Sequence, residues 1–170
     1  SGSLGLACAP AHGNDPQALP KSAGLALHKA KANGKQQVQV FNEALNAEAN
    51  YRLFVENNLR RALQENELEV YYQPKLSLRN GQLQGLEALL RWSHPERGMI
   101  YPDQFISVAE ETGLIIPIGK WVARQACRMS KQLLAVGLGE RPIAINLSPK
   151  QFSDPELVQS IRDILSEEDL

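Results

Sequence analysis

The sequence predicts an α/β fold in which helices cover a β-sheet, and three observations lead to that prediction. Two strand-like segments between residues 68 and 92 are joined through Asn80-Gly81, the strongest short signal for a β-hairpin. Residues 117–136 place apolar side chains at helical spacing. Residues 141–148 form a further strand-like run that leads into a helical segment.

The beginning of the chain predicts a small strand–helix–strand unit. Residues 3–8 are strand-like, and residues 16–31 have a helical pattern that stops at Asn33-Gly34, a usual C-terminal signal. Residues 36–41 alternate polar and apolar side chains, as an edge strand of a hairpin does.

A long helix is expected next, at residues 42–65, with an apolar stripe formed by Val55, Leu59, Ala62 and Leu63. Its first half, residues 43–50, has only a weak stripe and suits a stiff linker between two modules. The remaining elements are expected in this order: strands at 68–76 and 83–92, a loop at 93–104, helices at 102–112 and 117–136, a strand at 141–148 and a helix at 155–165.

Length and charge exclude several classes of function. The chain has 170 residues, with 18 Lys+Arg against 19 Asp+Glu, so no net positive charge is present to attract a nucleic acid polymer or an anionic membrane. No apolar run approaches the length of a membrane span. Cys8 and Cys127 form no motif and lie in apolar contexts, which predicts buried free thiols in a reducing, cytoplasmic location. A longer parent protein with a membrane anchor is compatible with these observations.

Alternation along the predicted strands separates an apolar face from a polar one. Within residues 83–92, the apolar face carries Leu86, Ala88, Leu90 and Trp92, and the other face carries Gly85, Glu87, Leu89 and Arg91. Polar side chains also lie on one face of each neighbouring strand. Together these faces hold a small polar group, formed by Gln73, Glu87, Arg91 and Asn146.

Two interpretations of the polar group stay open on the residues alone. Antiparallel sheets often have one face in water, where Glu87 and Arg91 would form an ordinary ion pair without a function. Against that, the helices that follow Pro102 suggest that both faces are covered, and asparagine is disfavoured in an apolar strand such as the one that carries Asn146. Glu and Asn supply the oxygen ligands that Mg²⁺ and Mn²⁺ prefer, although two ligands do not define a metal site.

Two stretches of the sequence resemble the opening of an EAL domain, the family that hydrolyses the bacterial second messenger cyclic di-GMP. They are "YYQPKLSLRNGQLQGLEALLRWSHPERGMIYPDQFISVAEETGLI" and "AINLSPKQF", and the resemblance spans about residues 59–165. "EALLRW" contains the family signature in its extended form, Glu-x-Leu-x-Arg. The earlier stretches "SGSLGLACAP" and "GLALHKAKANGKQQVQVF" resemble the end of a GGDEF domain, with Gly24 and His28 where that family has Asp and Tyr, and without its signature loop.

The resemblance implies a fold and a division of the chain. The fold would be the N-terminal part of a modified TIM-like barrel whose first strand runs antiparallel to the rest, which agrees with the hairpin at Asn80-Gly81. Residues 1–41 would be a GGDEF-like remnant, residues 42–58 a helical linker and residues 59–170 a truncated EAL domain. The resemblance also implies a homodimer formed through the EAL domain.

Roles for the polar group follow from the same resemblance. Glu87 and Asn146 match metal ligands of the family, with Mg²⁺ or Mn²⁺ as the metal and Glu87 as the catalytic residue. The positions that match nucleotide contacts are Gln73, Leu89, Arg91 and Pro102. Arg91 would contact a phosphate, which its planar fork of donors suits. Two divalent ions would activate water for in-line attack, opening cyclic di-GMP to linear pGpG.

The family's other functional motifs do not occur within these 170 residues, so the chain alone is expected to have little or no phosphodiesterase activity and to bind the dinucleotide weakly. Three hypotheses follow: part of an active phosphodiesterase, part of a degenerate EAL domain that acts as a cyclic di-GMP receptor, or an interaction module for dimerisation and signalling. The intact Glu87, Leu89, Arg91 and Asn146 favour the first.

Overall fold

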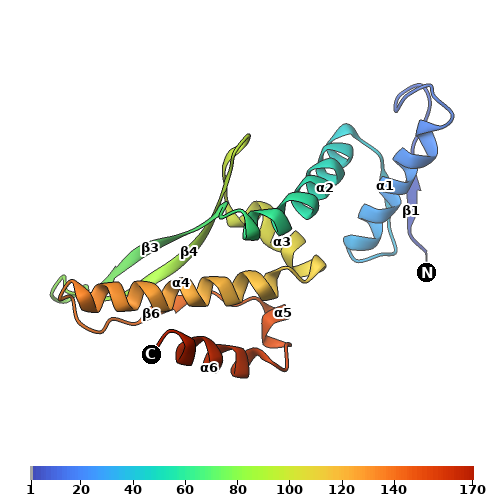
Figure 1. Ribbon diagram of the computed structural model, residues 1–170. Coiled ribbons are helices and arrows are strands. Elements are labelled where there is room, and N and C mark those ends of the chain that lie inside the picture. The colour runs from blue at the N-terminus through green and yellow to red at the C-terminus, as the bar shows by residue number, and fades with distance from the viewer. Residues whose placement is uncertain (1) are drawn as a thin grey trace. The chain divides into compact units, whose positions relative to one another are not determined.

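The computed structural model describes residues 2–170, which form two compact units. The division falls between Phe54 and Val55, inside the long helix α2 (Glu43–Gln64) (Figure 1). Among residues 2–170, no helix combines the length and the apolar composition that crossing a membrane would require.

The first unit contains β1 (Leu4–Leu6), α1 (Ala18–Ala32) and β2 (Val38–Val40). The two strands pair in parallel, so the prediction of a hairpin edge strand at residues 36–41 is wrong. The physical reason is that α1 separates the strands and returns the chain to the end at which β1 began, as a crossover between parallel strands must.

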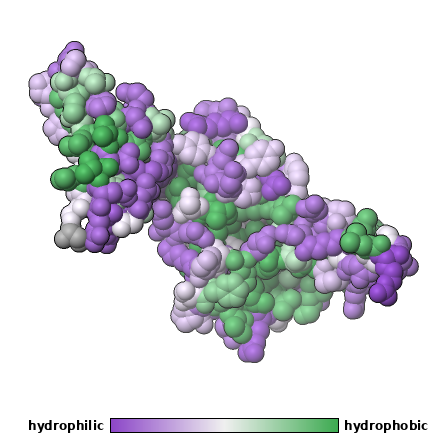
Figure 2. Space-filling model, turned by 180° about the vertical axis from the view of Figure 1, so that it is seen from behind, coloured by the Kyte–Doolittle hydropathy of each residue, from purple (hydrophilic) through white to green (hydrophobic). Residues whose placement is uncertain are grey.

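Close packing of α1 on the strands depends on Gly5. A Cβ atom at this position would lie 2.2 Å from the carbonyl oxygen of Ala23 and from the amide nitrogen of Leu27. The helix ends at Ala32 with Asn33 as its C-terminal cap, at the Asn33-Gly34 stop that the sequence predicts, and Gly34 has φ +100. On the opposite face of the strands, apolar side chains are exposed, and these are Leu4, Leu6, Val38 and Val40. Figure 2 shows hydrophobic side chains of this kind on the molecular surface.

The two cysteines differ in burial. Cys8 is exposed and Cys127 is partly buried, so the prediction of two buried thiols is wrong for Cys8. Cys8 lies just after β1, at the start of a turn in which its backbone N–H donates to Nδ1 of His12 at 2.9 Å. Its side chain therefore lies beyond the part of β1 that α1 covers.

The second unit is built on one mixed sheet. Its long hairpin, β3 (Leu68–Leu76) and β4 (Leu83–His94), is antiparallel as predicted. β3 pairs along one edge of β4, and the other edge carries β5 (Gly98–Ile100) in antiparallel and β6 (Ile143–Ile145) in parallel orientation. β3 therefore runs antiparallel to β4, whereas β6 runs parallel to β4.

The hairpin turn follows from its sequence. Gly81 has φ +68, a conformation that side chains disfavour, and Oδ1 of Asn80 accepts a hydrogen bond from the Gln82 N–H at 3.1 Å. The Ser77 N–H donates to the carbonyl oxygen of Gln82 at 2.8 Å and closes the loop. An asparagine–glycine pair thus provides both the backbone conformation and the side-chain acceptor that the turn needs.

β5 lies where the sequence predicts a loop, at residues 93–104, and that prediction is wrong. β4 continues to His94, whose buried Nδ1 accepts hydrogen bonds from the N–H groups of Glu96 and Arg97 at 3.1 and 3.3 Å. Gly98 then adopts φ +69, so the chain turns back and pairs with β4. His94 thus has the structural role in a turn that a histidine beside a proline suggests.

Helices cover one face of this sheet. α3 (Pro102–Thr112) and α4 (Ile115–Ala135) contact the strands, and α5 (Pro149–Phe152) and α6 (Leu157–Glu167) pack on α4. Pro102 begins α3 and Gly113, with φ +82, ends it, as the sequence predicts for a proline start. Trp92 of β4 is fully buried against Phe105 of α3, with ring centroids 5.7 Å apart.

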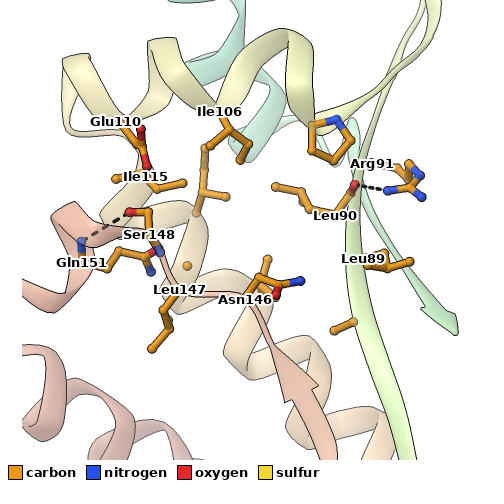
Figure 3. Close-up of a pocket in the computed structure, with 15 residues that line it drawn as sticks. Leu89, Leu90, Arg91, Ile106, Glu110, Ile115, Asn146, Leu147, Ser148 and Gln151 are labelled. Atoms are coloured by element: carbon orange, nitrogen blue, oxygen red, sulfur yellow. Dashed lines mark hydrogen bonds between the residues drawn. The ribbon is translucent and has the colours of Figure 1, made fainter. Parts of the chain in front are cut away.

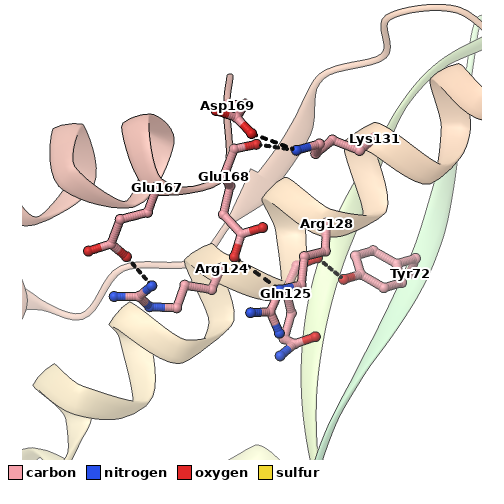
Figure 4. Close-up of polar contacts among 8 residues, drawn as sticks. All are labelled: Tyr72, Arg124, Gln125, Arg128, Lys131, Glu167, Glu168 and Asp169. Atoms are coloured by element: carbon pink, nitrogen blue, oxygen red, sulfur yellow. Dashed lines mark hydrogen bonds and ion pairs between the residues drawn. The ribbon is translucent and has the colours of Figure 1, made fainter.

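Charged side chains fasten α6 to α4 (Figure 4). Arg124 pairs with Glu167, Nε of Arg128 lies 3.0 Å from Oε1 of Glu168, and Nζ of Lys131 donates to the carbonyl oxygen of Glu168 at 2.6 Å. The hydroxyl of Tyr72 donates to the carbonyl oxygen of Gln125 at 2.9 Å and ties the sheet to α4.

Candidate functional site

Strand register brings three of the predicted site residues together. Gln73 lies directly opposite Glu87 across the hairpin, and Glu87 pairs with Ala144 of β6 on the other edge. Asn146 lies just past the end of β6, and its Nδ2 donates to Oε1 of Glu87 at 3.0 Å. The carboxylate and the carboxamide therefore face each other although they lie 59 residues apart in the chain.

The second oxygen of Glu87 has a partner that was not among the candidates. Nζ of Lys75 lies 3.0 Å from Oε2 of Glu87. The hydrogen bond from Asn146, and then the hydrogen bond and charge of Lys75, hold the pKa of the Glu87 carboxyl below its usual range. The alternative of an ion pair between Glu87 and Arg91 is not realised, because Glu87 pairs with Lys75, which shares the polar face of β3 with Gln73.

Arg91 is instead held by aromatic rings. Its Cζ lies 5.7 Å from the ring centroid of Tyr71 and 5.5 Å from that of Tyr101. Its Nη1 donates to the carbonyl oxygen of Leu90 at 2.8 Å (Figure 3). The sequence contains the signal for Tyr71, which alternation places on the face of Arg91, but none for Tyr101, which precedes α3.

The polar face of the hairpin is open rather than covered on both sides. The side chain of Glu87 is 29% exposed, and Gln73 is also exposed. The expectation that helices after Pro102 would cover both faces is wrong, because α3 and α4 pack on the apolar face of β4.

A pocket of about 340 Å³ lies between β4, α3, α4 and the segment after β6, and residues of both faces of β4 line it (Figure 3). Four of the six predicted site residues line it, namely Leu89, Arg91, Pro102 and Asn146. Its walls are mainly apolar, and the polar side chains that line it are Arg91, Glu110, Asn146, Ser148 and Gln151. An apolar pocket with a few convergent polar groups is typical of a small-molecule site.

Gln151 fixes the backbone that follows Asn146, and sequence reasoning missed it. Its N–H donates to Oγ of Ser148 at 3.3 Å, and its Oε1 accepts from the Ser148 N–H at 3.0 Å, which forms a capping box at the start of α5. Gly119 of α4 makes room for this side chain, since a Cβ there would lie 1.9 Å from Nε2 of Gln151. The Ser148–Gln151 spacing is the sequence signal that identifies the box.

The side-chain oxygens of Glu87 and Asn146 are donors of the kind that a divalent cation binds. A half-turn of the Asn146 carboxamide would present its oxygen in place of its nitrogen, so the pair offers two of the hard oxygen donors that Mg²⁺ takes. Within residues 2–170, no cluster of three or more His, Cys, Asp and Glu side chains is arranged to hold a metal. The pair would therefore supply part of a coordination sphere.

Comparison with known proteins identifies the family. The profile described as "EAL domain" matches residues 56–170, and the chain belongs to this family. The bifunctional diguanylate cyclase/cyclic di-GMP phosphodiesterase MucR of Pseudomonas aeruginosa is 42% identical over 165 residues, which cover 97% of this chain and 24% of MucR. The cyclic di-GMP phosphodiesterase PdeR of Escherichia coli is 40% identical over 165 residues, 97% of this chain and 25% of PdeR. The chain thus spans about a quarter of the length of these relatives.

Solved structures agree with the family assignment. The PaMucR phosphodiesterase in complex with c-di-GMP has a TM-score of 0.66 and 46% identity, over 68% of this chain and 47% of that chain. The EAL enzyme Bd1971 in its cAMP- and cyclic-di-GMP-bound form has a TM-score of 0.65 and 29% identity, over 92% of this chain and 42% of that chain. The mixed α/β fold is therefore that of EAL structures.

Proposed function

We propose that this chain is part of a phosphodiesterase that hydrolyses cyclic di-GMP to linear pGpG in bacterial second-messenger signalling. The observation that carries the proposal is the contact between Glu87 and Asn146 on an open polar face, next to a pocket that Arg91 and Pro102 line. Relatives that carry the name cyclic di-GMP phosphodiesterase support it.

The residues divide into two roles in this proposal. Glu87 and Asn146 hold Mg²⁺ or Mn²⁺, with Glu87 as the catalytic residue; the bound metal supplies Lewis-acid chemistry that makes water acidic enough to attack near neutral pH. Gln73, Leu89, Arg91 and Pro102 contact the nucleotide. The Arg91 guanidinium, with donors left after its bond to Leu90, binds a phosphate, and the apolar lining excludes water from the base.

The organisation proposed around the site is wider than this chain. β3, β4 and β6 are the first strands of a modified TIM-like barrel with an antiparallel first strand, an arrangement that the mixed pairing of β4 supports. Residues 1–41 are a remnant of a GGDEF-like domain and residues 42–58 are a helical linker. The protein is cytoplasmic in this stretch and forms a homodimer through the EAL domain.

The 170-residue chain alone is proposed to turn over little cyclic di-GMP. Glu87 and Asn146 supply two ligands, whereas Mg²⁺ requires six around it. Robust hydrolysis by the purified chain would contradict this part of the proposal.

A second candidate is a cyclic di-GMP receptor without hydrolysis, or a dimerisation and signalling module. One observation favours the receptor: Lys75 already neutralises the Glu87 carboxylate, while Arg91 and Pro102 line a pocket that can hold a nucleotide without a metal. Titration of cyclic di-GMP with and without Mg²⁺ separates these possibilities. A receptor binds cyclic di-GMP equally well with and without Mg²⁺, and an interaction module binds it under neither condition.

The decisive test is Glu87→Ala in the complete protein, with pGpG formation followed by chromatography. If Glu87 holds the metal, the rate should fall by more than the ~10- to 100-fold that loss of an outer-shell partner typically costs. The matched control is Glu65→Ala, an exposed carboxylate that follows α2 outside the pocket, which should leave the rate unchanged. Unchanged turnover by the Glu87 variant would refute the assignment.

A further inference from the structure

We propose that Tyr71 and Tyr101 are positioning residues, which hold the Arg91 guanidinium where an anionic nucleotide meets it. The inference rests on the proposed function, because it takes Arg91 as the group that binds a phosphate of cyclic di-GMP. It adds two residues to the site that act through Arg91 and do not themselves react.

The two rings come from different elements and meet at one guanidinium. Tyr71 lies in β3 opposite Leu89, on the strand face that carries Arg91, and Tyr101 occupies the extended position just before α3. Their ring centroids lie 5.7 and 5.5 Å from the Arg91 Cζ, within the distance at which an aromatic face attracts a cation. A third contact, from Nη1 to the Leu90 carbonyl oxygen at 2.8 Å, completes the support.

Core packing does not explain these tyrosines. Tyr71 is 49% exposed and Tyr101 is 53% exposed, whereas the neighbouring Tyr72 points to the other face and reaches Gln125. Both rings instead lie within cation–π distance of the same guanidinium. Their arrangement is accounted for by the contact with Arg91.

The charge of Arg91 remains available to a ligand. Lys75 takes the Glu87 carboxylate, and no ion pair within residues 2–170 joins Arg91 to an acidic group. A guanidinium has five N–H donors, of which one is bound to Leu90. Aromatic rings hold the cation without neutralising it, unlike a carboxylate, so the remaining donors stay free to bind phosphate oxygens.

Ring-removing and ring-keeping variants test the proposal in the complete protein. Cyclic di-GMP is titrated calorimetrically without divalent metal, so that binding is measured apart from turnover. Tyr71→Leu and Tyr101→Leu should each raise Kd about two- to five-fold, and together about ten-fold, from the size of an exposed cation–π contact. Tyr71→Phe and Tyr101→Phe keep the ring and should stay within about two-fold of wild type.

A double-mutant cycle separates positioning from direct contact. In an Arg91→Ala background the Leu variants should lose no further affinity, because the rings then have nothing to hold. The NMR signal of the Arg91 Nε–Hε group gives a readout that needs no ligand: it should shift in the Leu variants and stay in place in the Phe variants.

The outcomes are distinct. Wild-type affinity in the Leu variants, or an equal loss with and without Arg91, overturns the positioning role while the proposed function stands. A wild-type protein that binds no cyclic di-GMP without metal and also forms no pGpG with Mg²⁺ instead overturns the proposed function. An Arg91 signal unaffected by loss of either ring would show that the rings do not hold the guanidinium at all.

Discussion

One face of β4 is buried beneath helices, whereas the other is open and charged, although both alternate along the same residues. Leu86, Ala88 and Trp92 are at most 8% exposed, and Trp92 packs on Phe105. Glu87 and Arg91, on the opposite face, are held by Lys75, Asn146 and two tyrosines. The contrast shows that apolar packing holds β4 in place on its buried face. On the open face, contacts with neighbouring polar and aromatic side chains position Glu87 and Arg91.

The largest expected effect comes from breaking the buried face. Trp92→Ala removes a fully buried ring and should lower the free energy of unfolding by about 3–5 kcal/mol, the usual cost of emptying such a position. Leu89→Ala, three residues earlier on the open face, is the matched control and should cost far less. Denaturant unfolding followed by circular dichroism measures both, and equal losses would show that the two faces do not differ in this way.

A smaller loss is expected where the buried face meets α4. Tyr72→Phe removes the hydroxyl that donates to the Gln125 carbonyl oxygen, and should reduce the free energy of unfolding by about 0.5–1.5 kcal/mol. Tyr71→Phe removes a hydroxyl from the exposed ring of the open face and should change stability little. The denaturant midpoints of the two variants are compared. A larger loss of stability from Tyr71→Phe than from Tyr72→Phe would contradict the difference expected between the two faces.

On the open face we expect changes in ionisation rather than in stability. Asn146→Ala removes the main cause of the lowered pKa of Glu87, so that pKa should rise toward the usual carboxyl range. NMR titration of the Glu87 side-chain carbon measures it directly. No shift after the substitution would mean that the Asn146 contact does not form in solution.

Lys75→Met should also raise the pKa of Glu87, because it removes both the hydrogen bond and the positive charge of Lys75. The same titration applies, with Lys35→Met in the first unit as the control for loss of a positive charge. An unchanged Glu87 pKa in the Lys75 variant would show that this ion pair does not form in solution.

The weakest effect should be on the pH dependence of stability. Since the folded-state pKa of Glu87 lies below its unfolded value, this carboxyl stabilises the fold above the unfolded pKa, and that contribution is lost as pH falls through the folded pKa. Glu87→Gln should therefore flatten the acid side of the stability profile slightly. A steeper acid side in the variant would contradict the sign.

Sequence reasoning succeeded where one local signal decides the structure. Alternation places Leu86 and Trp92 on the buried face and Glu87 on the open one, and Asn80-Gly81 sets the hairpin that fixes their register. Pro102 marks the start of α3. In each case the residues that carry the sequence signal themselves form the turn, the helix end or the buried face that they predict.

The errors arise where partners are remote or segments are short. β5 has three residues and depends on a turn built around His94, and β2 alternates in the same way whether its partner is parallel or antiparallel. The partner of Glu87 was missed because alternation shows that Lys75 shares its face, but not which cation reaches the carboxylate. The residues alone left open whether the polar face is covered, since helices that follow a strand do not reveal which face they cover.

The two edges of β4 also bear on the order in which the chain folds. The edge that pairs with β3 is closed by a six-residue connection, whereas the other edge is completed only by β6, which lies beyond two helices in the chain. Short loops close at a smaller entropic cost than long ones, so we expect the hairpin to form early and β6 to join late. Native-state hydrogen exchange should accordingly find β6 opening before the hairpin. Glu87 would then be in place before Asn146 arrives, and the pair would report the last step of assembly.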